Sequence, residues 1–102
     1  MRGKAEAKLI IKFRDKLLEI YPHAYIYKIP DTPLGHIKPF DGFFFIKKGL
    51  AFVFEAKTGK NKLTPYQDAS LKKAFEAGAN IIVLRNVDKA MDEVNHAVGL
   101  YK

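Results

Sequence analysis

The sequence predicts an α/β fold in which a mixed sheet of about four strands is flanked by helices, in the order α-β-β-β-α-β-α. Two apolar runs, 43–46 and 50–54, are separated by the turn Lys47-Lys48-Gly49, which indicates an antiparallel hairpin. Segments with apolar residues at spacings of three and four indicate amphipathic helices. Because one of these helices lies between the third and fourth strands, the chain must cross over, and the sheet should be mixed.

The first helix is expected over residues 4–20, where one face carries Ile10, Phe13, Leu17 and Ile20. Pro22 ends this helix, because the residue before a proline is pushed out of the helical region. Alternation predicts the first strand over 24–29, and the prolines and glycine of 30–36 predict a loop. This loop, directly before the second strand, is well placed to touch a ligand.

The remaining elements are predicted from local signals. Residues 51–54 are apolar on both faces, which is typical of a central strand that is covered twice. Thr64 can cap the second helix, Pro65 suits its first turn, and Gly78 supplies its end. The buried stripe of this helix should consist of Leu71, Ala74 and Phe75. The segment 80–85, with the apolar run 81–84 inside it, predicts the fourth strand, and Asn86 or Asp88 caps the last helix.

The composition favours one globular domain, over residues 1–102, with a polyanionic partner. The chain carries 18 Lys and Arg against 11 Asp and Glu, a net charge of +7, so nucleic acid is the first partner to consider. Solubility alone could also account for this charge. Lys4, Lys8, Lys12 and Lys16 form a basic stripe on the first helix, which is either a solvated face or a phosphate contact. The absence of cysteine excludes disulfides and thiolate metal sites, and fits a cytosolic protein.

Charged residues stand at the end of the hairpin where a core would be apolar. The two strands bring Asp41 and Glu55 to the same end, and alternation places Lys57 on the same side as Glu55. Burying Glu55 without a partner would cost several kcal/mol, and a nearby cation would remove this cost. Simpler interpretations remain open: Asp41 could cap a turn, Glu55 and Lys57 could form an ion pair, and Gln67 could complete a capping box.

Asp41 followed by Glu55-Ala56-Lys57 resembles the motif of the PD-(D/E)XK nuclease superfamily. Gly59, the run Leu63-Thr64-Pro65 and Gln67 at a helix start are similar to the VRR-NUC branch of that superfamily. The resemblance covers roughly residues 6–94. One departure is that the usual proline directly before the aspartate is displaced, since the order here is Pro39-Phe40-Asp41.

The resemblance implies a restriction-endonuclease-like core and a site for Mg²⁺ or Mn²⁺. Asp41, Glu55 and the backbone carbonyl of Ala56 would hold the metal, and Lys57 would orient or activate the attacking water. Gln67 would help to fix the site. Glu6 matches an acidic residue that many members place near the metal from the first helix, although an acid in a first helical turn is also favoured by the helix dipole.

The resemblance further implies a metal-dependent DNA endonuclease that acts in repair, recombination or phage replication. Stand-alone members resemble Holliday junction resolvases, so branched DNA and a homodimer are expected, in the cytoplasm or, for a viral protein, in the host cytoplasm. The alternatives are a nicking or flap nuclease, the catalytic subunit of a larger assembly, and a non-catalytic nucleic-acid-binding module. The lysines expected to contact DNA are Lys60, Lys62, Lys4, Lys8 and Lys12.

Overall fold

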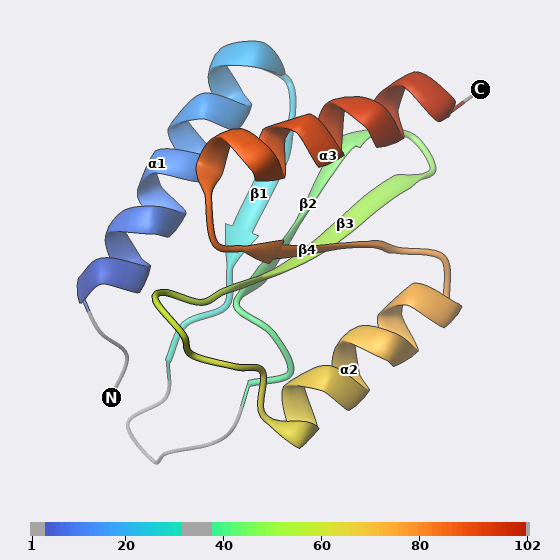
Figure 1. Ribbon diagram of the computed structural model, residues 1–102. Coiled ribbons are helices and arrows are strands. Elements are labelled where there is room, and N and C mark those ends of the chain that lie inside the picture. Colours follow the sequence, from blue (N-terminus) through green and yellow to red (C-terminus); the bar gives the residue numbers. More distant parts are fainter. Residues whose placement is uncertain (1–3, 32–37, 102) are drawn as a thin grey trace.

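A computed structural model of the chain describes residues 4–31 and 38–101. In these segments the elements follow the predicted order α-β-β-β-α-β-α (Figure 1). The helices are α1 (Lys4–Ile20), α2 (Pro65–Glu76) and α3 (Val87–Leu100), and the strands are β1 (Tyr25–Lys28), β2 (Gly42–Lys47), β3 (Leu50–Ala56) and β4 (Asn80–Leu84). Positions 32–36 of the predicted loop 30–36 lie outside the described residues.

The four strands form one mixed sheet in the order β1-β2-β3-β4. β1 pairs with β2 and β2 with β3 in antiparallel fashion, whereas β3 and β4 are parallel, as the predicted crossover requires. β3 therefore lies inside the sheet, and each of its residues except Ala51 is buried. This confirms the prediction of a central strand.

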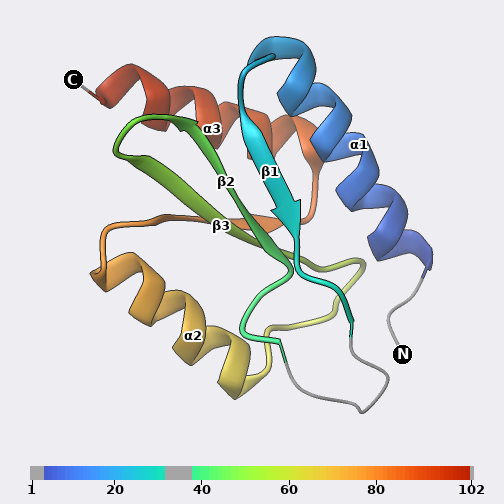
Figure 2. The same cartoon turned by 180° about the vertical axis from the view of Figure 1, so that it is seen from behind.

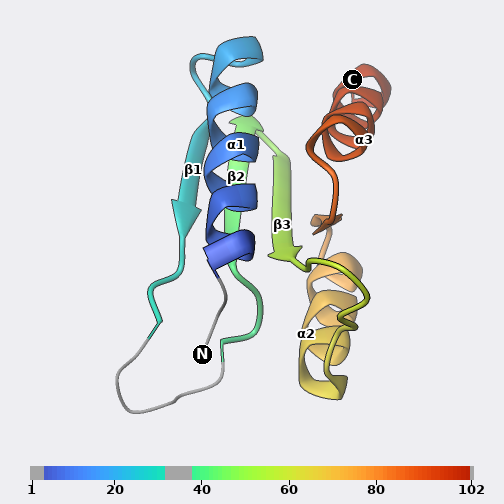
Figure 3. The ribbon, with the colours of Figure 1, turned by 60° about the vertical axis from the view of Figure 1, so that its left-hand side comes forward.

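One face of the sheet carries the hydrophobic core. α1 and α3 pack against each other over this face, and α2 lies apart from both (Figures 1 and 2). Figure 3 shows α1 lying over β2. The core consists of aromatic and branched side chains, of which the largest that are fully buried are Phe13, Phe44, Phe52, Phe54, Leu17, Ile82, Leu84 and Val94.

The other face of the sheet is only partly covered. α2 buries Leu71 there, and Val53 of β3 is buried as well. Farther out, on β1 and β2, the rings of Tyr25 and Phe45 stack with centroids 6.4 Å apart, and both remain exposed. The sheet thus has one dry face and one face that is open at the β1 side.

Two predicted core residues are exposed instead. Phe75 is 65% exposed because it lies in the last turn of α2, beyond the Leu71 turn that packs against the sheet. Ile20 is 43% exposed because it is the last residue of α1. The predicted caps are correct: Thr64 caps α2, and Asn86 rather than Asp88 caps α3.

None of the helices in residues 4–31 and 38–101 has the length and apolar character needed to cross a membrane.

Candidate metal and nucleic-acid site

Asp41 is held at the point where three strands meet. Its backbone carbonyl accepts from Ile29 N at 2.7 Å, and its backbone N–H donates to Phe54 O at 3.0 Å. The side chain is fully buried, and Oδ2 accepts from the backbone N of Ala56 at 2.8 Å. The carboxylate therefore has a fixed position beside the end of β3.

The next residue has to be a glycine. A Cβ atom at Gly42 would lie 2.3 Å from the carbonyl oxygen of Tyr27 and 2.6 Å from the ring of Phe54. Any side chain there would push β1 and Phe54 away. Because Asp41 precedes Gly42 directly, this close approach of the backbones helps to define where the carboxylate sits.

The backbone of Ala56 faces Asp41. In a strand the N–H and C=O of one residue point to the same side, and those of its neighbour point to the other side. The N–H of Ala56 donates to Asp41, whereas the N–H of Lys57 donates to Leu84 O of β4 at 3.0 Å. The carbonyl of Ala56 is thus directed to the side of the Asp41 carboxylate, as the resemblance implies for a metal ligand.

Glu55 projects from β3 toward α2. Its side chain is only 1% exposed. Oε2 accepts a hydrogen bond from Gln67 Nε2 at 3.0 Å and lies 3.7 Å from Lys57 Nζ. The expected cation beside Glu55 is therefore present, and it offsets part of the cost of burying the carboxylate.

Gln67 serves the helix and the candidate site at once. Its Oε1 accepts from Thr64 N at 3.0 Å, and its own backbone N donates to Thr64 Oγ1 at 3.1 Å, which completes a capping box. The other end of the same amide donates to Glu55. The capping interpretation and the site interpretation are compatible, because they use different atoms of the side chain.

Gln67→Glu separates these two tasks. Glutamate preserves the capping box but places a second carboxylate against Glu55. We expect the free energy of unfolding to fall by about 1–3 kcal/mol at pH 7, because a hydrogen-bond donor in a buried site is replaced by a like charge. Since like charges raise the pKa of the pair, this deficit should shrink as the pH falls toward 4.

Urea unfolding at pH 7 and pH 5 measures this effect. Thr64→Ala is the matched control, because it removes the cap at a cost of about 1 kcal/mol and leaves the Glu55 contact in place. If the Gln67→Glu protein were as stable as wild type at pH 7, the hydrogen bond from Gln67 to Glu55 would not stabilise the buried carboxylate as proposed.

Lys38 is a site residue that was not predicted from the sequence. Its ammonium lies 2.7 Å from Asp31 Oδ1 and 3.3 Å from Asp41 Oδ1, and it donates to Ile29 O at 3.1 Å. Its side chain is only 11% exposed. The only signal in the sequence is a lysine three positions before Asp41, in a loop where spacing does not determine direction. A cation beside Asp41 shows that the structure compensates this carboxylate with positive charge.

Burial lowers the pKa of Lys28 from its ordinary value of 10.5, and the nearby charge of Lys38 lowers it further. The unfolded chain therefore binds more protons than the folded chain as the pH approaches 10.5, and stability due to Lys28 rises with pH in that window. Lys28→Met should thus be more stable than wild type near pH 7, and this advantage should narrow toward pH 10.5. Thermal unfolding of both proteins across this pH range measures the difference in stability. A difference that does not change with pH would contradict a lowered pKa of Lys28.

The oxygen donors at this end of the sheet fit a hard divalent cation. Two buried carboxylates and one carbonyl, from Asp41, Glu55 and Ala56, are the ligand types that Mg²⁺ prefers. Among residues 4–31 and 38–101, no group of three or more His, Asp or Glu side chains gathers closely enough to hold a metal. Glu6 is buried on α1, and its role as an additional ligand stays a prediction.

The predicted DNA-contacting lysines are all exposed. Lys60 and Lys62 lie in the loop between β3 and α2, and Lys4, Lys8 and Lys12 lie on α1. Lys16, the last lysine of the predicted stripe, instead pairs with Glu19 at 3.2 Å. The basic stripe of α1 is therefore accessible to solvent, but its last lysine is engaged in an ion pair.

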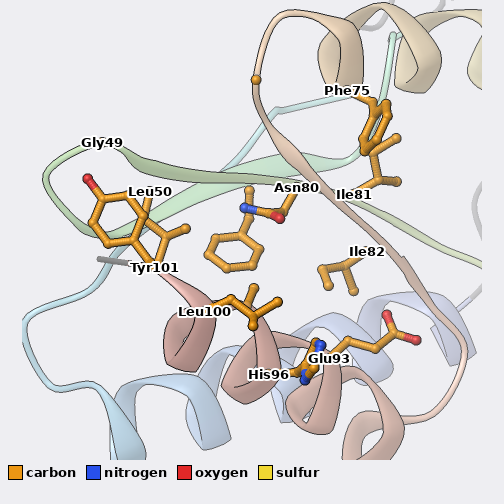
Figure 4. Close-up of a pocket in the computed structure, with 13 residues that line it drawn as sticks. Gly49, Leu50, Phe75, Asn80, Ile81, Ile82, Glu93, His96, Leu100 and Tyr101 are labelled. Carbon is orange, nitrogen blue, oxygen red and sulfur yellow. The ribbon is translucent and has the colours of Figure 1, made fainter.

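A separate apolar cavity lies at the opposite end of β3. It has a volume of about 770 Å³ and is lined mainly by apolar residues of β4, α3 and the β2–β3 turn, among them Leu50, Ile82 and Leu100 (Figure 4). Glu55 is the second-last residue of β3, whereas Leu50 is its first. Its described lining includes Glu93 and His96 but no Lys or Arg that could offset the charge of a phosphate.

Comparison of the chain with protein-family models, with curated proteins and with solved structures found no match. A function has to be inferred from the residues of the site.

Proposed function

We propose that this protein is a metal-dependent endonuclease that hydrolyses DNA phosphodiester bonds. The observation that carries the proposal is the arrangement at the end of β3, where the Ala56 N–H donates to the buried Asp41 carboxylate and Glu55 lies against Lys57. Asp41, Glu55 and the Ala56 carbonyl would hold Mg²⁺ or Mn²⁺. When bound there, such a cation offsets negative charge on the phosphate and lowers the pKa of bound water.

The charged residues of the chain have definable tasks in this reaction. Lys57, whose ammonium lies near the Glu55 carboxylate and reaches solvent, would orient the attacking water and offset the charge of the transition state. Gln67 holds the rotamer of Glu55 through its amide hydrogen bond. Lys38 neutralises Asp41 from the loop side. The first is a catalytic residue in this proposal, and the other two are positioning residues.

The substrate proposed is branched DNA, and the protein would act as a homodimer. The net charge of +7 favours a polyanion. Two cuts placed symmetrically at a four-way junction need two sites, which a two-fold dimer supplies. This part of the proposal depends on the resemblance to stand-alone junction resolvases, with a role in repair, recombination or phage replication.

Cleavage assays test the proposal directly. A labelled four-way junction is compared with linear duplex, flap and single-stranded DNA in Mg²⁺, Mn²⁺ and EDTA, with wild type, Lys57→Ala and Glu55→Ala. Paired cuts in the junction that disappear in EDTA and in both variants would support a resolvase. Cuts in other substrates under the same controls would support a nuclease that is not a junction resolvase. Binding to all substrates without cleavage would contradict the proposed enzymatic activity.

A further inference from the structure

We propose that a second pocket, on the α1 side of the sheet, binds a backbone phosphate of the nucleic acid next to the one that is cleaved. The pocket has a volume of about 300 Å³ and lies between α1 and the chain that follows β3 and β4. Figures 1 and 2 show that both of these chain segments turn toward α1. The residues that line it are Ala5, Lys8, Leu9, Lys12, Thr58, Gly59 and Arg85.

Among the described residues that line it, the pocket has three cations and no acid. Lys8 and Lys12 are one helical turn apart and therefore lie on the same side of α1, while Arg85 reaches the pocket from the end of β4. In the part of the chain that the structure describes, no ion pair joins any of these three side chains to a carboxylate. Like charges around one pocket repel each other, and an anion bound between them removes this repulsion.

The position of the pocket relates it to the candidate catalytic site. Ala56 is in register with Leu84, so the residues that follow them, Lys57 and Arg85, leave the sheet side by side. Thr58 in the pocket wall is the direct neighbour of Lys57. Glu55 faces α2, whereas the pocket faces α1. A DNA strand that crosses the end of β3 can therefore place one phosphate at Lys57 and a neighbouring one in the pocket.

The wall contributed by Thr58 and Gly59 leaves room for a phosphate. Gly59 has a φ of +59°, and a Cβ atom placed on it would meet no atom within 4 Å, so the backbone is open to approach. The Thr58 hydroxyl can donate a hydrogen bond, and the guanidinium of Arg85 matches the planar geometry of two phosphate oxygens. These donors match the oxygens of a phosphate group.

This inference rests on the proposed function only in taking the anion to be a phosphate of DNA. The first test needs no cleavage: inorganic phosphate is titrated in EDTA into ¹⁵N-labelled protein. We expect the amide signals of Thr58 and Gly59 to shift in wild type and in Lys16→Ala, and to stay in place when Lys8, Lys12 and Arg85 are all replaced by alanine. Lys16 is the matched control, because it lies on the same helix but outside the pocket and pairs with Glu19.

The second test measures binding of a short oligonucleotide in EDTA at several salt concentrations. Arg85→Ala and Lys12→Ala should each weaken binding roughly fivefold and reduce the slope of log K against log salt by about one, whereas Lys16→Ala should do neither. If wild type cleaves DNA, Arg85→Ala should raise KM more than it lowers kcat. The proposed phosphate site would be overturned if the triple variant responded to phosphate like Lys16→Ala, or if Arg85→Ala and Lys12→Ala bound the oligonucleotide as Lys16→Ala does. Such a result would not affect the proposed nuclease function. Conversely, if the protein never cleaved DNA, both binding tests could still be carried out and interpreted.

Discussion

Glu55→Gln should lower the rate of metal-dependent cleavage by about 10²-fold or more while the protein stays folded. The substitution keeps the size of a side chain that is 1% exposed and removes only its charge. The neutral amide is a poor ligand for Mg²⁺ and no longer offsets the ammonium of Lys57, which lies 3.7 Å from Glu55 Oε2. The cleavage rate and the circular dichroism spectrum, measured on the same preparation, separate lost chemistry from lost structure.

Metal binding supplies an independent measurement for the same variant. Titration of Mn²⁺, followed by isothermal calorimetry, should show a site in wild type that is weakened in Glu55→Gln and in Asp41→Asn. Glu19→Gln is the matched control, because Glu19 is an exposed acid of α1. If Glu55→Gln cleaved DNA as fast as Glu19→Gln, Glu55 would not belong to the reaction and the proposed function would fail.

Phe54→Ala should lower the free energy of unfolding by about 3–5 kcal/mol. The ring of Phe54 is fully buried between α1 and the sheet, with centroids 6.0 Å from Phe13 and 6.2 Å from Phe44. Domains of this kind are stable by only about 5–15 kcal/mol, so the loss should be visible as a large drop in Tm. The substitution also removes the ring that packs against Gly42, the residue that follows Asp41.

The control for this prediction lies on the other face of the sheet. Phe45 belongs to β2 like Phe44, but it is 45% exposed on the open side. Phe45→Ala should therefore cost about 1 kcal/mol or less. Similar losses for Phe54→Ala and Phe45→Ala in urea unfolding would mean that the sheet does not have one dry and one open face.

The order of the elements could be predicted because its signals are local. The hairpin follows from two apolar runs and a short turn, and the starts of α2 and α3 follow from the caps Thr64 and Asn86. Burial could not be predicted equally well. Phe75 fits the helical period of Leu71, yet it is exposed and borders an open cavity beside β3 and β4. Periodicity defines a face of a helix but not how far that face is covered.

The residues of the candidate site also differ in whether their positions could be predicted from the sequence. Asp41 could be placed beside the end of β3 from the sequence because one hairpin connects them, and alternation placed Lys57 beside Glu55. Lys38 could not be predicted, because a loop without regular geometry carries it back to Asp41. Arg85 depends on the parallel pairing of β3 and β4, whose register is set by tertiary packing. Spacing thus predicted the two acids, whereas the positions of Lys38 and Arg85 became clear only from the fold.

The connectivity of the sheet also determines when the site is complete during folding. Asp41 and Glu55 belong to one hairpin, whose formation closes only a short loop. Gln67 reaches Glu55 only when α2 packs on the sheet, and the Leu84 carbonyl accepts from Lys57 N only after the crossover has formed. Short loops close at a lower entropic cost than long ones, so we expect the two carboxylates to come together before their orienting partners do. A chain still emerging from the ribosome would hold both acids without a fixed Glu55 rotamer. The proposed nuclease activity should therefore begin only when the C-terminal third of the chain has folded.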